Sequence, residues 1–169
     1  NNAISWSKFT NCNLYKLFNF PDQKLDTVPR LKLVKVIEKA IEKIKPNIVY
    51  IHHPGDINYD HQVAAQVVLN AIRPMSYHKI FPEIRAFETP SSTDQTPKVE
   101  NYLFKPNFYV SIDKFWDLKR ESLKIYSSEI KKFPHPRSIV AIRSLAIKRG
   151  AESGFKMAEA FYIIRKVWK

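Results

Sequence analysis

The stretch K-P-N-I-V-Y-I-H-H-P-G-D-I-N-Y-D-H-Q, residues 45–62, decides the fold. It contains a short β-branched apolar run at residues 48–51, which is typical of a strand buried on both faces of a parallel sheet. Three histidines, two aspartates and an asparagine follow at residues 52–61. Open α/β sheets bind ligands outside the carboxyl ends of their strands, so this polar segment lies where a ligand site is expected.

Helical patterns flank this stretch on both sides. Before it, apolar residues recur at helical spacing over residues 33–44, with Pro29 in the first turn and Asp26 or Thr27 as the expected cap. After it, residues 63–72 predict a second helix that ends before Pro74. Helix, buried strand, polar loop and helix together make an α/β layer unit.

The remainder of the chain continues this pattern, and we predict one α/β domain over residues 1–169 with a Rossmann-like, layered parallel sheet flanked by helices. The segment 158–167 is apolar at both parities and fits a strand or a helix. The other expected elements are a strand or loop at 14–20, strands at 80–87 and 108–112, a polar loop at 91–105, and helices at 114–133 and 136–149, the last ended by Gly150.

Composition limits the class of protein. With 44% apolar residues among 169, the chain is long enough to bury the core of one domain. The single cysteine, Cys12, excludes an intramolecular disulfide. We see neither an apolar run near 20 residues nor a signal peptide, so we expect no membrane span and a cytoplasmic protein, with the oligomeric state left open.

The net charge of +12, from 28 basic and 16 acidic residues, favours anionic partners. The basic residues are spread along the chain and no nucleic-acid-binding motif is present, so we expect no nucleic-acid partner. A non-catalytic basic domain that binds nucleic acid or an anionic glycan is the alternative function.

The chemistry of residues 52–61 has two interpretations. Imidazoles and carboxylates are the ligands that suit zinc, and a catalytic zinc usually takes three of them and leaves one position open for water. In the other interpretation, Asn58 or Asp60 caps the following helix while Pro54 and Gly55 turn the chain. Spacing alone does not separate a metal site from a capped turn.

The segment G-D-I-N-Y-D-H-Q, residues 55–62, resembles the second metal motif of the LmbE/PIG-L family of zinc-dependent N-acetylglucosaminyl deacetylases. The resemblance implies an LmbE-like α/β fold and a hydrolase that uses zinc to remove an acetyl group from an N-acetylated sugar or glycoconjugate. Three further segments are similar to parts of that family: F-P-D-Q-K-L-D at 20–26, F-E-T-P-S-S-T at 87–93 and G-F-K-M-A-E-A-F at 154–161.

The resemblance also implies roles for single residues. His61, which ends the D-H pair, matches a zinc ligand, and Asp60 before it would orient a neighbouring polar group. Asp56 stands where the motif has its earlier aspartate. Many members have an oxyanion-stabilising histidine three residues before the ligand, where this chain has Asn58, whose amide can donate a hydrogen bond but cannot transfer a proton.

Other polar residues have weaker assignments. His53, in the loop, and Arg137, which directly follows Pro136, are candidate substrate contacts. Glu88 and Glu159 lie in apolar segments, where each is either a core ion pair or a site residue, and we favour the ion pair. We expect His78 at the surface.

The family's first motif, H-P-D-D-E, supplies two further zinc ligands and the general base, and it does not occur before residue 52. Residues 53–56 keep its H-x-x-D spacing, but the base position would be Gly55, so we reject that alignment. We therefore expect the later part of a longer enzyme that acts on a linear amide. A catalytically silent scaffold, or a half-site that depends on a partner, is the alternative.

Overall fold

The computed structural model describes residues 2–74 and 79–168, so His78 lies outside the described residues. Contacts divide the chain into two compact units. One consists of Asn1–Phe18 with Tyr109–Ala160, and the other of Asn19–Phe108 with Phe161–Lys169. That the two act as a single deacetylase-like domain stays a prediction.

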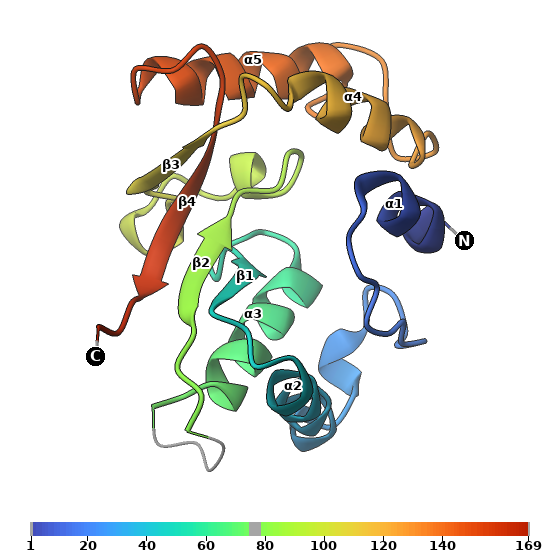
Figure 1. Ribbon diagram of the computed structural model, residues 1–169, viewed down its shortest axis with the longest axis vertical. Coiled ribbons are helices and arrows are strands. Elements are labelled where there is room, and N and C mark those ends of the chain that lie inside the picture. The colour runs from blue at the N-terminus through green and yellow to red at the C-terminus, as the bar shows by residue number, and fades with distance from the viewer. Residues whose placement is uncertain (1, 75–78, 169) are drawn as a thin grey trace. The chain divides into compact units, whose positions relative to one another are not determined.

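The chain contains both helices and strands (Figure 1), and the expected α/β class is confirmed. No helix in the described ranges is long and apolar enough to cross a membrane. The elements are α1 (Asn2–Thr10), η1 (Leu25–Thr27), α2 (Arg30–Ile44), β1 (Ile48–His52), α3 (Tyr59–Ala71), β2 (Glu83–Phe87), η2 (Thr93–Gln95), η3 (Glu100–Tyr102), β3 (Phe108–Ser111), α4 (Trp116–Lys124), α5 (Ile139–Ala151) and β4 (Ala158–Arg165).

The strands of the described residues form a sheet in the order β1-β2-β4-β3. β1 runs parallel to β2, with Val49 opposite Ile84. β4 runs antiparallel to β2, with Phe161 opposite Phe87, so the sheet is mixed rather than wholly parallel as predicted. The apolar segment near the end of the chain, which fitted either a strand or a helix, is therefore a strand.

Helix α2 forms where the apolar periodicity predicts it. It ends at Lys45, which adopts a left-handed conformation (φ 50°) and donates its N–H to the carbonyl of Ile41 before Pro46. The expected cap from Asp26 or Thr27 is wrong, because these residues belong to the short helix η1 and Pro29 holds the cap position without a side-chain hydrogen bond.

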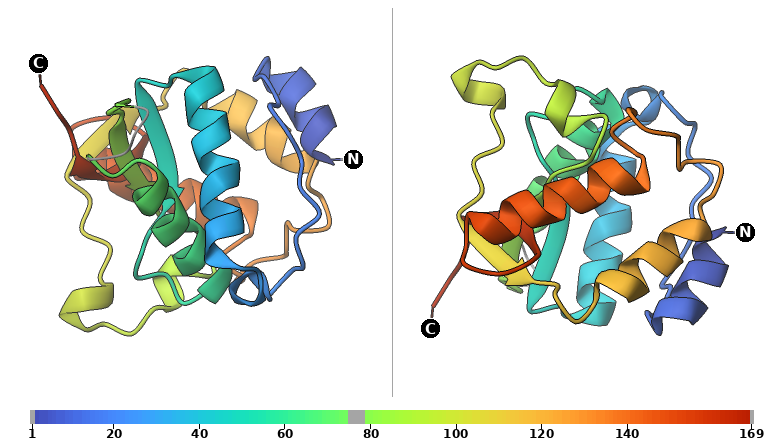
Figure 2. Two further views of the ribbon diagram at one scale, coloured as in Figure 1. Left: turned by 90° about the horizontal axis from the view of Figure 1, so that it is seen from below. Right: turned by 90° about the horizontal axis from the view of Figure 1, so that it is seen from above.

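Helices α2 and α3 run side by side in the unit that contains β1 and β2 (Figure 2). Two buried apolar clusters explain this packing, since α3 contributes to both of them. The first cluster is Ile41, Ile51, Ala65, Ile72, Ile84 and Ala86; the second is Leu33, Val34, Val63, Val67 and Ala71.

Strand β1 is not buried on both faces, and this prediction is wrong. Ile51 is buried, whereas Ile48 and Tyr50 are 38% and 49% exposed. The physical reason is that Val49 and Ile51 pack against residues of α2 and α3, whereas Ile48 and Tyr50 point to the opposite face of the strand. The apolar run reflects packing against α3 on one face rather than cover on two.

The unit of residues 1–18 and 109–160 differs more from the sequence prediction. The helix expected over residues 114–133 ends at Lys124, and a series of turns follows it. Gly150 lies inside the last turn of α5 rather than ending it. It is buried, and a Cβ there would come within 2.6 Å of the Phe155 carbonyl oxygen, so the site has no room for a side chain. Helix α1, which contacts α4, was not predicted.

Four buried side chains form the core of the unit of residues 1–18 and 109–160. They come from the end of β3, from α4 and from α5, and they pack against Leu123, Ile130 and Met157. The four residues are Ile112, Trp116, Ile142 and Ala146.

Replacing Ile84 by Ala tests the core assignment. Ile84 is 1% exposed, so the variant should lose about 2–5 kcal/mol of unfolding free energy through lost burial and a cavity. The matched control is Ile48→Ala on the exposed face of β1, which should cost about 1 kcal/mol or less. Chemical denaturation gives both values, and equal losses would contradict the assignment.

Candidate functional site

The polar segment becomes the loop between β1 and α3. Asn58 is the N-cap of α3, since its Oδ1 accepts the backbone N–H of Asp60 at 2.9 Å. Asp60 is not a cap; its Oδ1 accepts the N–H of Leu25 at 2.9 Å and ties η1 to the start of α3. The capping interpretation is therefore confirmed for Asn58, and its side-chain amide nitrogen is left for other contacts.

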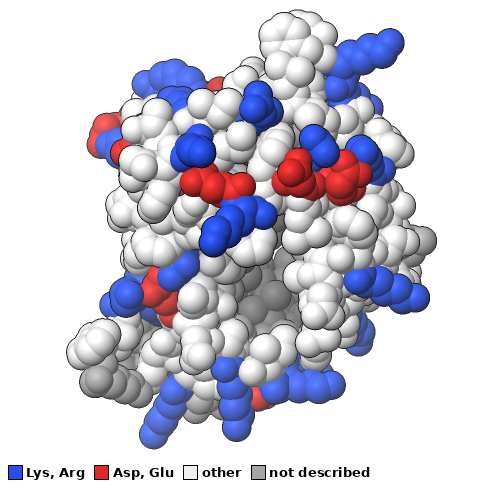
Figure 3. Space-filling model, turned by 45° about the horizontal axis from the view of Figure 1, so that its top comes forward, with Lys and Arg blue, Asp and Glu red and all other residues white. Residues whose placement is uncertain are grey.

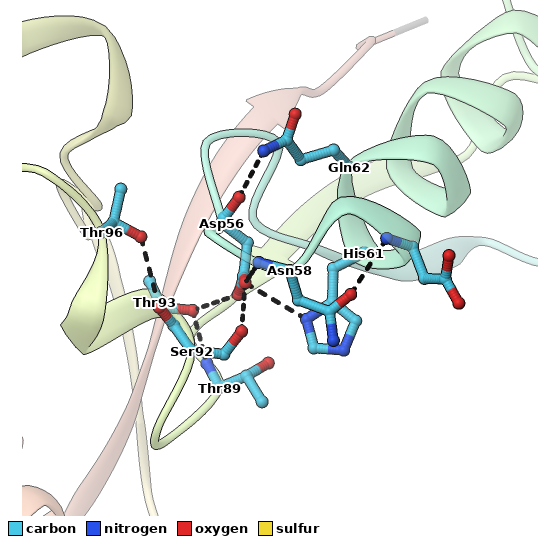
Figure 4. Close-up of polar contacts among 9 residues, drawn as sticks. Asp56, Asn58, His61, Gln62, Thr89, Ser92, Thr93 and Thr96 are labelled. Carbon is cyan, nitrogen blue, oxygen red and sulfur yellow. Dashed lines mark hydrogen bonds and ion pairs between the residues drawn. The ribbon is translucent and has the colours of Figure 1, made fainter. Parts of the chain in front are cut away.

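A buried carboxylate, that of Asp56, organises the loop (Figure 4). Its Oδ1 accepts hydrogen bonds from the Ser92 hydroxyl and from the N–H of Asn58 at 2.9 Å. Its Oδ2 accepts the Thr93 hydroxyl at 2.7 Å, and its backbone carbonyl accepts the Gln62 side-chain amide at 2.6 Å. Each carboxylate oxygen thus has a partner, as a buried charge requires.

Ser92 and Thr93 come from the loop that follows β2. Since β1 and β2 are parallel, their carboxyl ends lie at the same edge of the sheet, and Asp56 joins the two loops there. The second loop has its own bracing, because Thr93 Oγ1 accepts the N–H of Thr89 at 2.8 Å and Thr96 donates to the Ser92 carbonyl at 3.3 Å. No local sequence pattern indicated a role for these hydroxyls.

The environment of Asp56 lowers its pKa from 3.8 to about 2. Burial is the largest effect and acts in the opposite direction, raising the pKa of the carboxyl group. The contacts from His61, Ser92, Asn58 and Thr93 outweigh burial together, because each favours the charged form. Asp56 is therefore a carboxylate at neutral pH.

The imidazole of His61 lies beside this carboxylate. Its Nδ1 is 3.3 Å from Asp56 Oδ1, and the side chain is 20% exposed. The His52 ring stacks on the His61 ring, with centroids 4.0 Å apart and an angle of 19° between the planes. The ring of Phe87 lies against His52, with centroids 4.8 Å apart. Burial, and next the neighbouring His61, lower the pKa of His52 to about 4, so His52 is neutral at pH 7.

The donor set can be tested against the zinc site that the sequence implies. His61 fits as one ligand, because a carboxylate beside one ring nitrogen is the usual arrangement for a metal-binding histidine. The buried Nδ1 of His61 makes no hydrogen bond of good geometry, although it lies 3.3 Å from the Asp56 carboxylate. No three His, Cys, Asp or Glu side chains in the described part of the chain are placed to hold a metal ion, so these residues alone do not fit a catalytic zinc.

His53 has a different environment from the other loop histidines. It is 7% exposed, its Nε2 lies 2.9 Å from the Tyr102 carbonyl oxygen, and Phe104 meets its ring edge-on at 5.4 Å. Since a carbonyl oxygen only accepts, Nε2 carries the proton. His53 also lines a cavity of about 370 Å³ with Gly55, residues 100–103 and Lys105. Its role as a substrate contact stays a prediction.

Arg137, the remaining candidate, does not belong to the β1–α3 loop. Arg137 is in the other compact unit, where its Nη1 donates to Glu129 at 2.5 Å. Its role as a substrate contact stays a prediction. Glu159, in the same unit, forms the expected ion pair, with Lys119.

Comparison with known proteins gives a family match over part of the chain. Residues 1–72 match the family model of GlcNAc-PI de-N-acetylase, PIG-L. This match confirms the resemblance to the PIG-L family. The matched residues include the whole β1–α3 loop and most of α3. No curated protein matches the chain significantly.

Solved structures show that the fold is LmbE-like. The conserved protein TT1542 from Thermus thermophilus has a TM-score of 0.73 and 20% identity, over 99% of this chain and 73% of that one. N,N'-diacetylchitobiose deacetylase from Pyrococcus horikoshii has a TM-score of 0.73 and 16% identity, over 96% of this chain and 61% of that one. GalB, the 4-carboxy-2-hydroxymuconate hydratase of Pseudomonas putida, has a TM-score of 0.71 and 16% identity, over 99% of this chain and 71% of that one.

Replacing Asp56 by Asn tests the central role of the buried carboxylate. The amide keeps the shape but replaces one carboxylate oxygen by an NH₂ donor, so one of the two hydroxyls loses its acceptor and the unfolding free energy should fall by about 2–4 kcal/mol. Asp22→Asn, at an exposed position in the same unit, should change it by about 0.5 kcal/mol or less. A similar effect of both variants in urea denaturation would contradict the role.

The same carboxylate predicts a pH dependence of stability. Because its pKa is lower in the folded than in the unfolded chain, the stabilisation is complete above about pH 4 and is lost as pH falls toward 2. The wild type should lose about 2 kcal/mol more than Asp56→Asn between pH 5 and pH 2. Parallel pH profiles for the two proteins would show that the carboxylate has no such effect.

Proposed function

We propose that the protein is a hydrolase of the de-N-acetylase type that removes an acetyl group from an N-acetylated sugar or glycoconjugate. The observation that carries this proposal is the arrangement at residues 56–61, where a buried carboxylate lies beside the imidazole of His61 at the carboxyl edge of the sheet. The family match covers this loop, and the P. horikoshii structure that shares the fold is a deacetylase.

Zinc is the proposed cofactor. When bound in such a hydrolase, it supplies a Lewis acid and a water of lowered pKa. His61 would be one of its ligands. The described residues alone do not complete a zinc site.

The residues around His61 have separate tasks in this proposal. Asp56 positions the ring and is itself held by the hydroxyls of Ser92 and Thr93, so we assign it positioning rather than proton transfer. Asp60 fixes the start of α3 through Leu25. Asn58 uses its oxygen as the helix cap, which leaves its NH₂ group to donate to negative charge that develops on the amide oxygen.

The fold by itself does not choose the reaction, because GalB, a hydratase, shares it. The function of a basic binding domain has less support. On the face drawn in Figure 3, Lys and Arg side chains are separated by uncharged side chains and lie among Asp and Glu, rather than forming one basic patch. We retain cytoplasmic location as part of the proposal.

The role of His61 can be tested by titrating the protein with Zn²⁺. His61→Ala should weaken zinc binding by about tenfold or more, since a direct ligand matters at least as much as its supporting groups. His135→Ala, which removes a partly exposed histidine from the other unit, should leave the dissociation constant unchanged. Equal dissociation constants for wild type and His61→Ala would refute the assignment.

Asn58 can be tested without disturbing the helix cap. Serine is also a good N-cap, so Asn58→Ser should keep stability but lower the rate of acetate release from N-acetylglucosamine conjugates by about a hundredfold. Asn58→Ala should lower the rate equally and also cost about 1 kcal/mol of stability. A loss of turnover below about tenfold in Asn58→Ser would exclude an oxyanion role.

A further inference from the structure

The segment of residues 2–18, which contains α1 and the stretch that follows it, has an unusually apolar surface. Helix α1 has no buried residue, and residues 11–18 are all exposed. Six large apolar side chains of this segment are each between 41% and 48% exposed. They are Ile4, Phe9, Leu14, Tyr15, Leu17 and Phe18. Single exposed apolar residues are normal, but a group of them in one short segment indicates an interaction surface.

Helix α1 uses one face for packing within its own compact unit. Its half-buried residues recur at helical spacing, at positions 3, 6, 7 and 10, and the helix lies beside α4 (Figure 2). The exposed positions between them include Ile4, Lys8 and Phe9. The outward face of α1 is therefore both apolar and basic.

The stretch after α1 continues this surface as an irregular arm. Residues 12–18 belong to no helix or strand, and the sequence L-Y-K-L-F at 14–18 exposes four large apolar side chains around one lysine. The Lys16 ammonium lies 5.1 Å from the centre of the Phe18 ring, a cation–π contact. Aromatic and aliphatic side chains interleaved with lysine are the composition of protein segments that lie at a membrane–water boundary.

The charges of the segment indicate the kind of partner. Lys8 and Lys16 are its charged side chains, since residues 2–18 contain no Asp, Glu or Arg. A second copy of the chain would bring the same two lysines to the contact, and each copy has a net charge of +12, so like charges would oppose self-association. An anionic surface, by contrast, attracts both the two lysines and the chain as a whole.

We propose that residues 2–18 bind the surface of an anionic phospholipid bilayer. In this arrangement Lys8 and Lys16 lie at the level of the phosphates, and the apolar side chains enter the boundary between headgroups and acyl chains. Such binding needs no pocket of fixed shape, which suits an irregular arm. The proposal does not depend on the hydrolase function, because it rests on residues 2–18 alone.

Cys12 provides a probe for the test. It is the single cysteine of the chain and is exposed, so a polarity-sensitive maleimide fluorophore attached to it reports on this segment. Phosphatidylcholine vesicles that contain phosphatidylserine should shift its emission to shorter wavelength and should sediment with the protein. Vesicles of phosphatidylcholine alone should bind about tenfold more weakly, and added salt should weaken binding to the anionic vesicles.

A charge variant tests the role of the two lysines. Lys8→Gln combined with Lys16→Gln should weaken partitioning into the anionic vesicles about tenfold or more, since each lysine near such a surface contributes about fivefold. The matched control is Lys32→Gln combined with Lys35→Gln, which removes two exposed lysines from α2 and should leave partitioning unchanged within about twofold.

An apolar variant tests insertion of the arm. Leu14→Ser combined with Leu17→Ser should weaken partitioning about tenfold or more and abolish the emission shift of the Cys12 probe, without loss of the fold, because both leucines are exposed. Leu31→Ser, at a position in α2 that is 65% exposed, is the matched control and should leave both measurements unchanged.

The outcomes separate a lipid surface from other partners. Equal partitioning of the wild type and both segment variants, or equal binding to vesicles with and without phosphatidylserine, would overturn the proposal. A dimer in analytical ultracentrifugation that Leu14→Ser with Leu17→Ser dissociates would assign the segment to self-association instead. Binding to polyglutamate without binding to vesicles would assign it to an acidic protein, and either result contradicts the lipid assignment.

Discussion

The buried carboxylate of Asp56 is the interaction on which the candidate site depends. It accepts hydrogen bonds from the loop after β2 and from the backbone at the start of α3, so one charge connects two strands and a helix. A charge buried in this way is tolerated only when its oxygens are satisfied. The two hydroxyls and the Asn58 N–H meet that requirement, and the position of His61 follows from it.

The sequence predicted the elements whose pattern is local. Helix α2 and strands β1 and β3 were found from apolar spacing, and the ligand-rich loop was placed correctly after β1. Burial was predicted less well, because the number of covered faces of β1 depends on which helices pack against the sheet, and periodicity does not report this. Helix α1 was missed because its apolar residues form only a weak stripe with no buried member.

The same distinction applies to the site. Asn58 as a cap and His61 at the start of α3 follow from neighbouring residues, so both could be read from the sequence. The bonds from Ser92 and Thr93 to Asp56 span more than thirty positions and arise from strand pairing. The S-S-T run after a predicted strand was visible, but nothing local indicated which group its hydroxyls would meet.

The close packing of Gly55 against the backbone of Tyr102, where a Cβ would lie 2.8 Å from the Tyr102 Cα, has a thermodynamic consequence. A loop fixed by a buried carboxylate on one side and by a neighbouring backbone on the other has lost most of its conformational entropy during folding. A ligand that enters such a preorganised loop has little further ordering to impose, so more of its contact energy remains as affinity. Rigidity here is therefore a property that favours recognition.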